Sequence, residues 1–192
     1  RRLEQGVFVM ALSDGMGSGR QAHEESDTVV SLFFQFAEAG FTIDMALRLM
    51  NAAMIFGAEA ERFSTLDACL VDEYTGIVDC YKVGAHVSFV RHKRRTEVIE
   101  ADSLPMGASA SLEALPFRSY LEAGDYLVLV TDGVLEYLQV EDAVEMLRQL
   151  IEELADTDAV TFARKIIERV LLFTGGTAAD DMTVLVLKAL ER

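Results

Sequence analysis

Short apolar runs separated by turns fill the middle of this sequence, from residue 64 to residue 131, and amphipathic helices are predicted on both sides of them. One more apolar run opens the chain and another lies near its end. Successive strands joined by short turns favour antiparallel pairing over alternating parallel units. We therefore expect an α+β fold, a four-layer α-β-β-α sandwich of two mainly antiparallel sheets flanked by helices. The expected strands are residues 7–12, 65–71, 77–83, 87–91, 97–101, 115–121, 126–130 and 183–187, and the expected helices are residues 20–39, 42–56, 140–154 and 158–173.

Aspartates mark the ends of three of these expected strands. Asp14 follows the first strand, Asp132 follows the strand at 126–130, and Asp180 precedes the last one. If the strands pair, the three carboxylates converge at one edge of the core. Two unit charges about 4 Å apart repel by roughly 4 kcal/mol at an effective dielectric of about 20, so such a cluster needs a counter-charge. A hard divalent cation bound through oxygen supplies it, and the pattern therefore indicates a metal-dependent hydrolase.

Glycines follow two of the aspartates, Gly15 after Asp14 and Gly133 after Asp132. A residue without Cβ lets the chain turn sharply and lets a backbone carbonyl approach an ion. Mg²⁺ and Mn²⁺ accept carboxylate, carbonyl and water ligands, and two such ions sharing one carboxylate activate a water molecule for attack on a phosphoryl group. This chemistry needs no serine, cysteine or histidine nucleophile, and none with a plausible base stands out in the sequence.

Composition narrows the other possibilities. The chain has 192 residues, 51% of them hydrophobic, which suits one domain at residues 1–192 with a substantial core. A net charge of −15 makes nucleic acid and anionic membrane surfaces poor partners. Only two cysteines, Cys69 and Cys80, are present, so neither a disulfide framework nor a zinc cluster is expected. No membrane-spanning run is visible, and an opening Arg1-Arg2 without methionine suggests a piece of a longer protein.

Several other features have competing interpretations. The glycines at 15, 17 and 19 resemble a phosphate-binding loop but lack nucleotide-binding spacing, and Met16 stands where a haloacid-dehalogenase-type phosphatase would carry its second aspartate. His23 is interpreted as a local hydrogen-bonding residue and His86 as a turn residue, rather than as a metal ligand or a catalytic group. The basic cluster at 91–95 is either an exposed hairpin tip or a docking site for an acidic phosphoprotein. The eight methionines are expected to fill the core.

The sequence resembles the phosphatase domain of the stage II sporulation protein E family, which belongs to the metal-dependent, type 2C-like superfamily of serine/threonine protein phosphatases. The first part of the resemblance is the run Ser13-Asp14-Gly15-Met16-Gly17-Ser18-Gly19, followed by Arg20, Ala22-His23 and Glu25-Ser26. It continues through Phe63-Ser64-Thr65-Leu66-Asp67, Lys82-Val83-Gly84, Ser88-Phe89-Val90, Leu104-Pro105-Met106-Gly107, Ala123-Gly124-Asp125, Thr131-Asp132-Gly133-Val134 and Asp180-Asp181-Met182-Thr183. These motifs cover nearly the whole chain in order.

The resemblance implies a centre of two Mn²⁺ or Mg²⁺ ions at one end of the sandwich. Asp14 would be the bridging carboxylate, the Gly15 carbonyl would bind the second ion, and Asp132 and Asp180 would be the remaining carboxylate ligands, with Asp181 only their neighbour. Metal-bound water would hydrolyse a phosphoserine or phosphothreonine. In sporulation relatives the substrate is a phosphorylated anti-sigma factor antagonist, whose dephosphorylation frees a sigma factor.

The resemblance also raises expectations about regulation and about the rest of the protein. The helices at 20–56 would be regulatory elements and a possible homodimer surface. Family members carry an earlier strand with a Gly-Asp pair near the metals, which this sequence starts too late to contain. We expect a cytoplasmic domain, with any membrane anchor or sensor region outside the printed sequence. The alternative function is a catalytically impaired phosphatase-fold module that mainly binds a signalling partner.

Overall fold

The computed structural model of the chain describes residues 1–15, 17, 19–56, 63–85, 87–93, 95–112, 116–138, 140–173 and 181–191, without the side chains of Gln5 and Gln21. The chain divides into two compact units, one formed by Arg1–Ala85 with Ala101–Ser119, the other by His86–Glu100 with Tyr120–Arg192. Each unit is built on a four-stranded sheet. Within the described ranges, no helix is long and apolar enough to cross a membrane.

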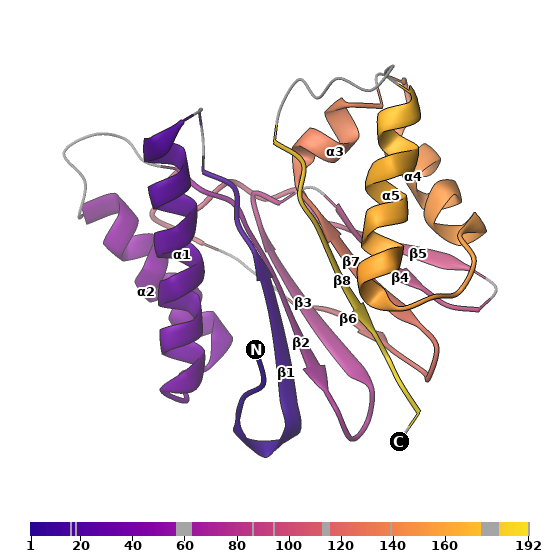
Figure 1. Ribbon diagram of the computed structural model, residues 1–192. Helices are drawn as coiled ribbons and strands as arrows, with labels where there is room; N and C mark the ends of the chain where they lie inside the picture. Colours follow the sequence, from indigo (N-terminus) through magenta and orange to yellow (C-terminus); the bar gives the residue numbers. More distant parts are fainter. Residues whose placement is uncertain are drawn as a thin grey trace. The chain divides into compact units, whose positions relative to one another are not determined.

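The first unit contains the sheet β1-β2-β3-β6 and two helices. The strands are β1 (Val7–Leu12), β2 (Leu66–Asp72), β3 (Ile77–Val83) and β6 (Phe117–Tyr120), with the short 3-10 helix η1 (Glu4–Gly6) before β1. The pairs β1–β2 and β2–β3 are antiparallel. The helices α1 (Arg20–Glu38) and α2 (Ile43–Phe56) lie along one face of this sheet (Figure 1). Their buried contacts with the strands include Val9, Val29, Phe33, Leu47, Met50, Leu66, Ala68 and Val83.

The second unit contains the sheet β5-β4-β7-β8 and three helices. The strands are β4 (Val87–Arg91), β5 (Thr96–Glu100), β7 (Tyr126–Val130) and β8 (Val184–Lys188), and all three neighbouring pairs are antiparallel. The helices are α3 (Asp132–Glu136), α4 (Ala143–Glu153) and α5 (Ala159–Phe173). Helices α4 and α5 pack on the sheet through a buried cluster that includes Phe89, Val128, Leu147, Ile151, Phe162 and Ile166. Figure 1 shows α5 running beside β8.

Most of the elements lie where the hydrophobic pattern predicted them. The strands at 7–12, 77–83, 87–91 and 126–130 have the predicted bounds, and the others differ by one or two residues at an end. The predicted helix at 140–154 begins only at Ala143, because the side chain of Asp142 caps it by accepting a hydrogen bond from the Glu145 N–H at 3.0 Å. The short helix α3 was not predicted, since five residues are too few to show a helical period.

Candidate metal centre

The structure fixes the backbone of Asp14 from both sides. Strand β1 pairs antiparallel with β2, so the residues that follow β1 lie beside those that precede β2. The Asp14 N–H donates to Thr65 Oγ1 at 2.9 Å, and the Asp14 carbonyl accepts from the Thr65 N–H at 2.8 Å and from Ser64 Oγ at 2.9 Å. Ser13 Oγ donates to the Thr65 carbonyl at 2.6 Å. Asp14 therefore lies at the end of a sheet strand, as predicted, in a loop held by hydroxyl groups.

Position 15 needs a glycine because nearby atoms leave no room for a Cβ, and not because of its backbone angles. It forms an isolated antiparallel bridge with Ser64, and a Cβ placed on it would come within 2.1 Å of the Ala22 carbonyl oxygen in the first turn of α1. A backbone oxygen cannot rotate away as a flexible side chain does, so any larger residue would displace either the loop or the helix. The sequence suggested a sharp turn at this glycine, and the structure adds the close approach of α1.

Asp132 lies at the corresponding end of β7 in the second unit. It is the first residue of α3, and its Oδ1 accepts from the N–H of Gly133 at 2.9 Å. The preceding residue, Thr131, is bound to Thr183 at the start of β8: the Thr131 N–H donates to the Thr183 carbonyl at 3.1 Å, and the Thr183 N–H donates to Thr131 Oγ1 at 2.9 Å. The segment that leads into β8 is thus fastened next to Asp132.

The predicted ligand set is only partly within the described chain. Asp14 belongs to the first unit and Asp132 to the second, and Asp180 lies outside the described residues. Within those residues, no group of three or more His, Cys, Asp or Glu side chains lies together as a metal site. The donors themselves suit a hard divalent cation, because they are carboxylate and backbone oxygens. Convergence of Asp14, Gly15, Asp132 and Asp180 on two ions stays a prediction.

A buried ion pair near the first half of the site was not singled out from the sequence. Asp67 in β2 lies opposite Leu12 in the β1–β2 register and opposite Lys82 in β3. Lys82 Nζ donates to Asp67 Oδ2 at 2.7 Å, and both side chains are almost completely buried, at 1% and 3% exposed. The signal available in the sequence was an acid near the start of one strand and a base near the end of the next, in strands that also contain Asp72 and Asp79.

Part of the basic cluster at 91–95 has a structural role. The guanidinium of Arg91 is 9% exposed, donates to Asp156 Oδ1 at 2.6 Å and to the Leu154 carbonyl at 2.8 Å, and lies against the rings of Tyr126 and Phe162. This hydrogen bond lowers the pKa of Asp156, because it stabilises the carboxylate. Arg91 therefore is not part of an exposed tip.

His92 is also used inside the second unit. Its Nδ1 lies 2.8 Å from Asp125 Oδ2, and its ring packs beside Tyr120 at a centroid distance of 5.3 Å. The predicted turn is confirmed, because the His92 N–H donates to the Arg95 carbonyl at 2.8 Å. Of the other two histidines, His23 is exposed on α1 and His86 lies outside the described residues. Lys93 and Arg95 are exposed, so they are the described members of the cluster available for a docking role.

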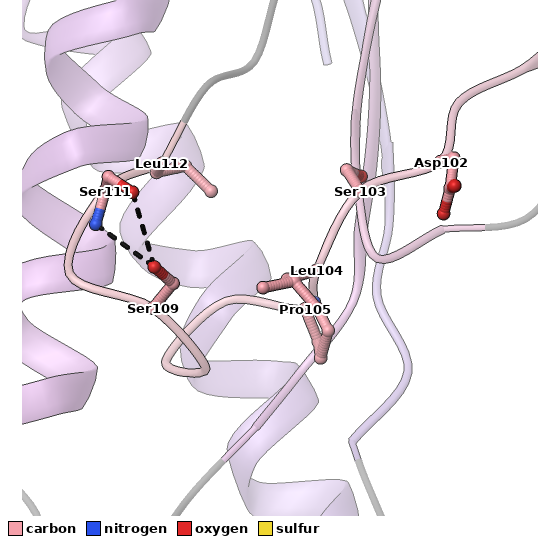
Figure 2. A pocket seen from close by; sticks show the side chains of 7 residues that line it. All are labelled: Asp102, Ser103, Leu104, Pro105, Ser109, Ser111 and Leu112. Carbon is pink, nitrogen blue, oxygen red and sulfur yellow. Dashed lines mark hydrogen bonds between the residues drawn. The ribbon is translucent and has the colours of Figure 1, made fainter.

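A pocket of about 310 Å³ lies on the loop between β5 and β6. Its described lining consists of residues 102–105 together with Ser109, Ser111 and Leu112, and none of these is a predicted metal ligand. In Figure 2 the hydroxyl of Ser109 is bonded to both the N–H and the hydroxyl of Ser111, which ties one wall of the pocket together. Asp102 is the one acidic residue among these described lining residues.

The family model described as "Stage II sporulation protein E (SpoIIE)" matches residues 4–190 of this chain. The chain belongs to the stage II sporulation protein E family. Among curated relatives, it is 33% identical over 187 residues to stage II sporulation protein E of Priestia megaterium, covering 97% of this chain and 32% of that protein. It is 29% identical over 182 residues to the protein of the same name from Bacillus subtilis strain 168, covering 94% of this chain and 22% of that protein. It thus spans a third or less of the length of these relatives.

Solved structures agree with the family. The PP2C phosphatase domain of SpoIIE from Bacillus subtilis, solved with a fragment of its regulatory domain, has a TM-score of 0.88 and 29% identity to this chain and covers 95% of it and 54% of that chain. The RsbU and RsbW domains of Rv1364c from Mycobacterium tuberculosis share the fold, with a TM-score of 0.81 at 17% identity over 97% of this chain and 54% of that chain. The predicted fold class is confirmed: this SpoIIE-family chain has the α+β sandwich fold of PP2C-type phosphatases, with two four-stranded sheets and flanking helices.

Proposed function

We propose that this chain is the catalytic domain of a metal-dependent protein phosphatase that hydrolyses phosphoserine or phosphothreonine on a regulatory protein. The family membership of residues 4–190 supports this class of reaction. The observation that carries the proposal is that Asp14 follows the partly buried strand β1, that Asp132 follows the buried strand β7, and that each lies in a segment fastened by hydroxyl hydrogen bonds. Aspartates whose backbone is held in this way suit an ion-binding role better than a solvated surface role.

Asp14, the Gly15 carbonyl, Asp132 and Asp180 would hold two Mn²⁺ or Mg²⁺ ions, which when bound supply an activated water and neutralise the phosphoryl oxygens. Structures of fold relatives support these metals: the SpoIIE phosphatase domain of Bacillus subtilis has been presoaked with Mn, and RsbX has been solved in complex with magnesium. In this chain, Ser64 and Thr65 orient Asp14, and the Thr131–Thr183 pair orients the segment that contains Asp132.

The substrate is proposed to be a phosphorylated anti-sigma factor antagonist, within sporulation or sigma-factor signalling. The chain is 33% identical over 92 residues, 47% of its length, to a protein named phosphoserine phosphatase RsbU from Bacillus subtilis, of which the match covers 28%. The net charge of −15 adds no affinity for nucleic acid. The rest of this signalling role follows from the family resemblance.

A second candidate function, binding of a protein partner by a catalytically impaired module, is favoured by one surface. Helix α2 and its preceding loop expose four large apolar side chains, Phe41, Met45, Leu49 and Phe56, of which Phe56 is 85% exposed. They are spaced so that three of them follow one side of the helix. This surface is also the proposed place of homodimerisation through the helices at 20–56. A concentration series of sedimentation velocity, with Met45→Glu as the disrupting variant, would test it.

Hydrolysis of p-nitrophenyl phosphate and of a phosphoserine peptide, with and without Mn²⁺, tests the proposed reaction. We would compare the printed chain with an N-terminally extended version and with Asp132→Asn. We expect Mn²⁺-dependent turnover that Asp132→Asn abolishes. Filling a folded-state site at 100 times its dissociation constant should also raise the unfolding free energy by about 2.7 kcal/mol. Absence of turnover in both lengths, with no Mn²⁺-induced rise in melting temperature, would favour the binding module instead.

A further inference from the structure

The hydrogen bonds that hold Asp14 come from a segment that is itself held by another loop. Ser64 and Thr65 bind both backbone polar groups of Asp14, as described above. Ser64 then pairs with Met106 through two backbone hydrogen bonds: the Met106 N–H donates to the Ser64 carbonyl at 2.9 Å, and the Ser64 N–H donates to the Met106 carbonyl at 3.2 Å. Both residues are completely buried, at 0% exposed. Any shift of Met106 therefore reaches Asp14 through one intermediate residue.

One side chain of α2 fastens the loop that contains Met106. Asn51 Oδ1 accepts from the Gly107 N–H at 2.8 Å, and Asn51 Nδ2 donates to the Ser109 carbonyl at 2.8 Å. The Asn51 side chain therefore forms hydrogen bonds to the backbone of the loop on both sides of residue 108. Ser109 also lines the pocket of Figure 2, so the loop that Asn51 binds borders this pocket.

Burial makes this contact hard to replace. Asn51 is only 3% exposed, although asparagine is a poor helix former and a buried amide costs free energy unless both of its polar ends are bonded. A leucine at this position would suit the apolar face of α2 better. A polar residue at position 51 is therefore explained by its hydrogen bonds to the loop and not by the needs of the helix.

We propose that Asn51 is a positioning residue for Asp14, acting through Gly107, Met106 and Ser64. Only the activity measurement for this inference depends on the proposed phosphatase function. The competing explanation is that the loop is held by the buried Met106 side chain, which packs in the same cluster as Val29 and Phe33, with Asn51 merely filling its own bonds. The two explanations differ in what happens to Asp14 when the amide is removed.

Amide hydrogen exchange of the metal-free protein separates them. We would compare the wild type with Asn51→Leu and with Val29→Ala, a control that loses buried volume in the same cluster but no loop hydrogen bond. We expect exchange at Gly107, Met106 and Thr65 to accelerate at least tenfold in Asn51→Leu, with the central amides of β2 and β3 no faster than in the control. Acceleration at Gly107 alone, with Thr65 as in the control, would overturn the proposal.

Asn51→Asp supplies a conservative second variant, also in case Asn51→Leu does not fold. Its carboxylate still accepts from Gly107, but it repels the Ser109 carbonyl unless it is protonated. We expect faster Thr65 exchange than in the wild type at pH 7.5 and a return towards the wild-type value near pH 5, after correction for intrinsic rates. An unchanged ratio across this range would count against the proposal.

The activity readout is the Mn²⁺ concentration for half-maximal hydrolysis of p-nitrophenyl phosphate. A loosened Asp14 should raise it at least fivefold in Asn51→Leu, with the KM for the ester within twofold of the wild type and with no such rise in Val29→Ala. An equal rise in the control would overturn the proposal. Hydrogen exchange tests the connection from Asn51 to Thr65 even if the chain has no turnover. Failure of the phosphatase assignment can therefore be distinguished from failure of this inference.

Discussion

Thr131 and Thr183 bind each other twice, once through the main chain and once through the Thr131 hydroxyl. Thr131 directly precedes Asp132, and Thr183 lies three positions after Asp180. The pair thus extends the antiparallel ladder of β7 and β8 beyond Val130 and Val184. Its effect is to tie together the two segments that carry the predicted carboxylate ligands of the second unit.

Replacing Thr131 by valine tests this contact, because valine keeps the shape and removes the acceptor. The Thr183 N–H then loses its partner, and because Thr183 is exposed, the cost is that of an ordinary hydrogen bond, about 0.5–1.5 kcal/mol. We expect a loss of that size in the free energy of unfolding from urea titrations, together with weaker Mn²⁺ binding. Thr131→Ser keeps the hydroxyl and should retain most of the stability. A valine variant as stable as the wild type would show that water replaces the bond.

Asp132 is the most direct test of the proposed chemistry. Asp132→Ala should abolish Mn²⁺-dependent turnover and leave the metal-free fold largely intact. Within the described chain, the Asp132 side chain accepts its hydrogen bond from the N–H of Gly133, and its loss would remove one of the negative charges that the proposed metal site brings together. Thermal unfolding without metal and ester hydrolysis with Mn²⁺ measure the two effects.

Asp142→Ala is the matched acidic control for Asp132 in the same unit. It removes the cap of α4 and should cost about 1 kcal/mol of stability, while turnover persists. Turnover that survives in Asp132→Ala, or disappears in both variants, would contradict the assignment of Asp132 as a ligand.

Helices and strands could be predicted from the sequence where the local hydrophobic pattern determines them, whereas side-chain contacts between distant segments could not. Apolar runs and glycine-rich turns placed β1, β3, β4 and β7, because strand periodicity is a local property. The hydroxyl groups of Ser64 and Thr65 had no distinguishing local signal, since their role depends on lying beside Asp14 once β1 and β2 are in register. The same register converts Asp67 and Lys82, two isolated charges in the sequence, into an ion pair.

Exposure of one member of the basic cluster, Arg91, was mispredicted for a similar reason, whereas Lys93 and Arg95 are exposed. Five neighbouring basic positions are typical of an exposed tip, yet the rings of Tyr126 and Phe162 cover the guanidinium of Arg91. Those rings come from a later strand and a later helix, so the sequence around Arg91 does not report them. The candidate site shows the same difference. The aspartates at the strand ends could be recognised in the sequence, whereas the contact of Asn51 with the loop at 107–109 could be found only in the structure.

The Asp67–Lys82 pair predicts a strongly non-additive double-mutant cycle. Lys82→Met leaves a buried carboxylate without its main counter-charge, and breaking a buried pair in this way costs about 3–5 kcal/mol. Adding Asp67→Leu removes that charge, and apolar replacements of buried pairs are often neutral or stabilising. We therefore expect the double variant to be more stable than Lys82→Met in guanidinium titrations. Additive losses would show that the pair is not coupled.

Arg91 and Arg95 should separate a structural from a docking role within one hairpin. Arg91→Ala loses a charged hydrogen bond to Asp156, the bond to Leu154 and the contact with two rings, for an expected cost of about 2–4 kcal/mol. Arg95→Ala lies at an exposed position and should change stability by no more than about 0.5 kcal/mol. An increased KM for a phosphoprotein, but not for p-nitrophenyl phosphate, in Arg95→Ala would support docking. Equal destabilisation by both changes would contradict the burial of Arg91.

The buried thiol of Cys69 predicts a decline of stability at alkaline pH. Their Sγ atoms lie 2.6 Å apart across β2 and β3, and both cysteines are free. Burial, and then the neighbouring Cys80, raise the pKa of the Cys69 thiol well above its ordinary value. The folded state therefore holds a proton that the unfolded state releases above about pH 8.5, and the unfolding free energy falls by up to about 1.4 kcal/mol per pH unit for such a thiol.

A comparison with Cys69→Ala isolates this effect, because lysines and tyrosines titrate in the same range in both proteins. The difference in unfolding free energy between wild type and Cys69→Ala should be constant below about pH 8 and should shrink as the pH rises towards about 10, since only the wild type has this proton to lose. Urea titrations at half-unit pH steps measure it. Parallel curves would mean that the thiol ionises as readily in the folded chain as in the unfolded one, which is incompatible with its complete burial at 0% exposed.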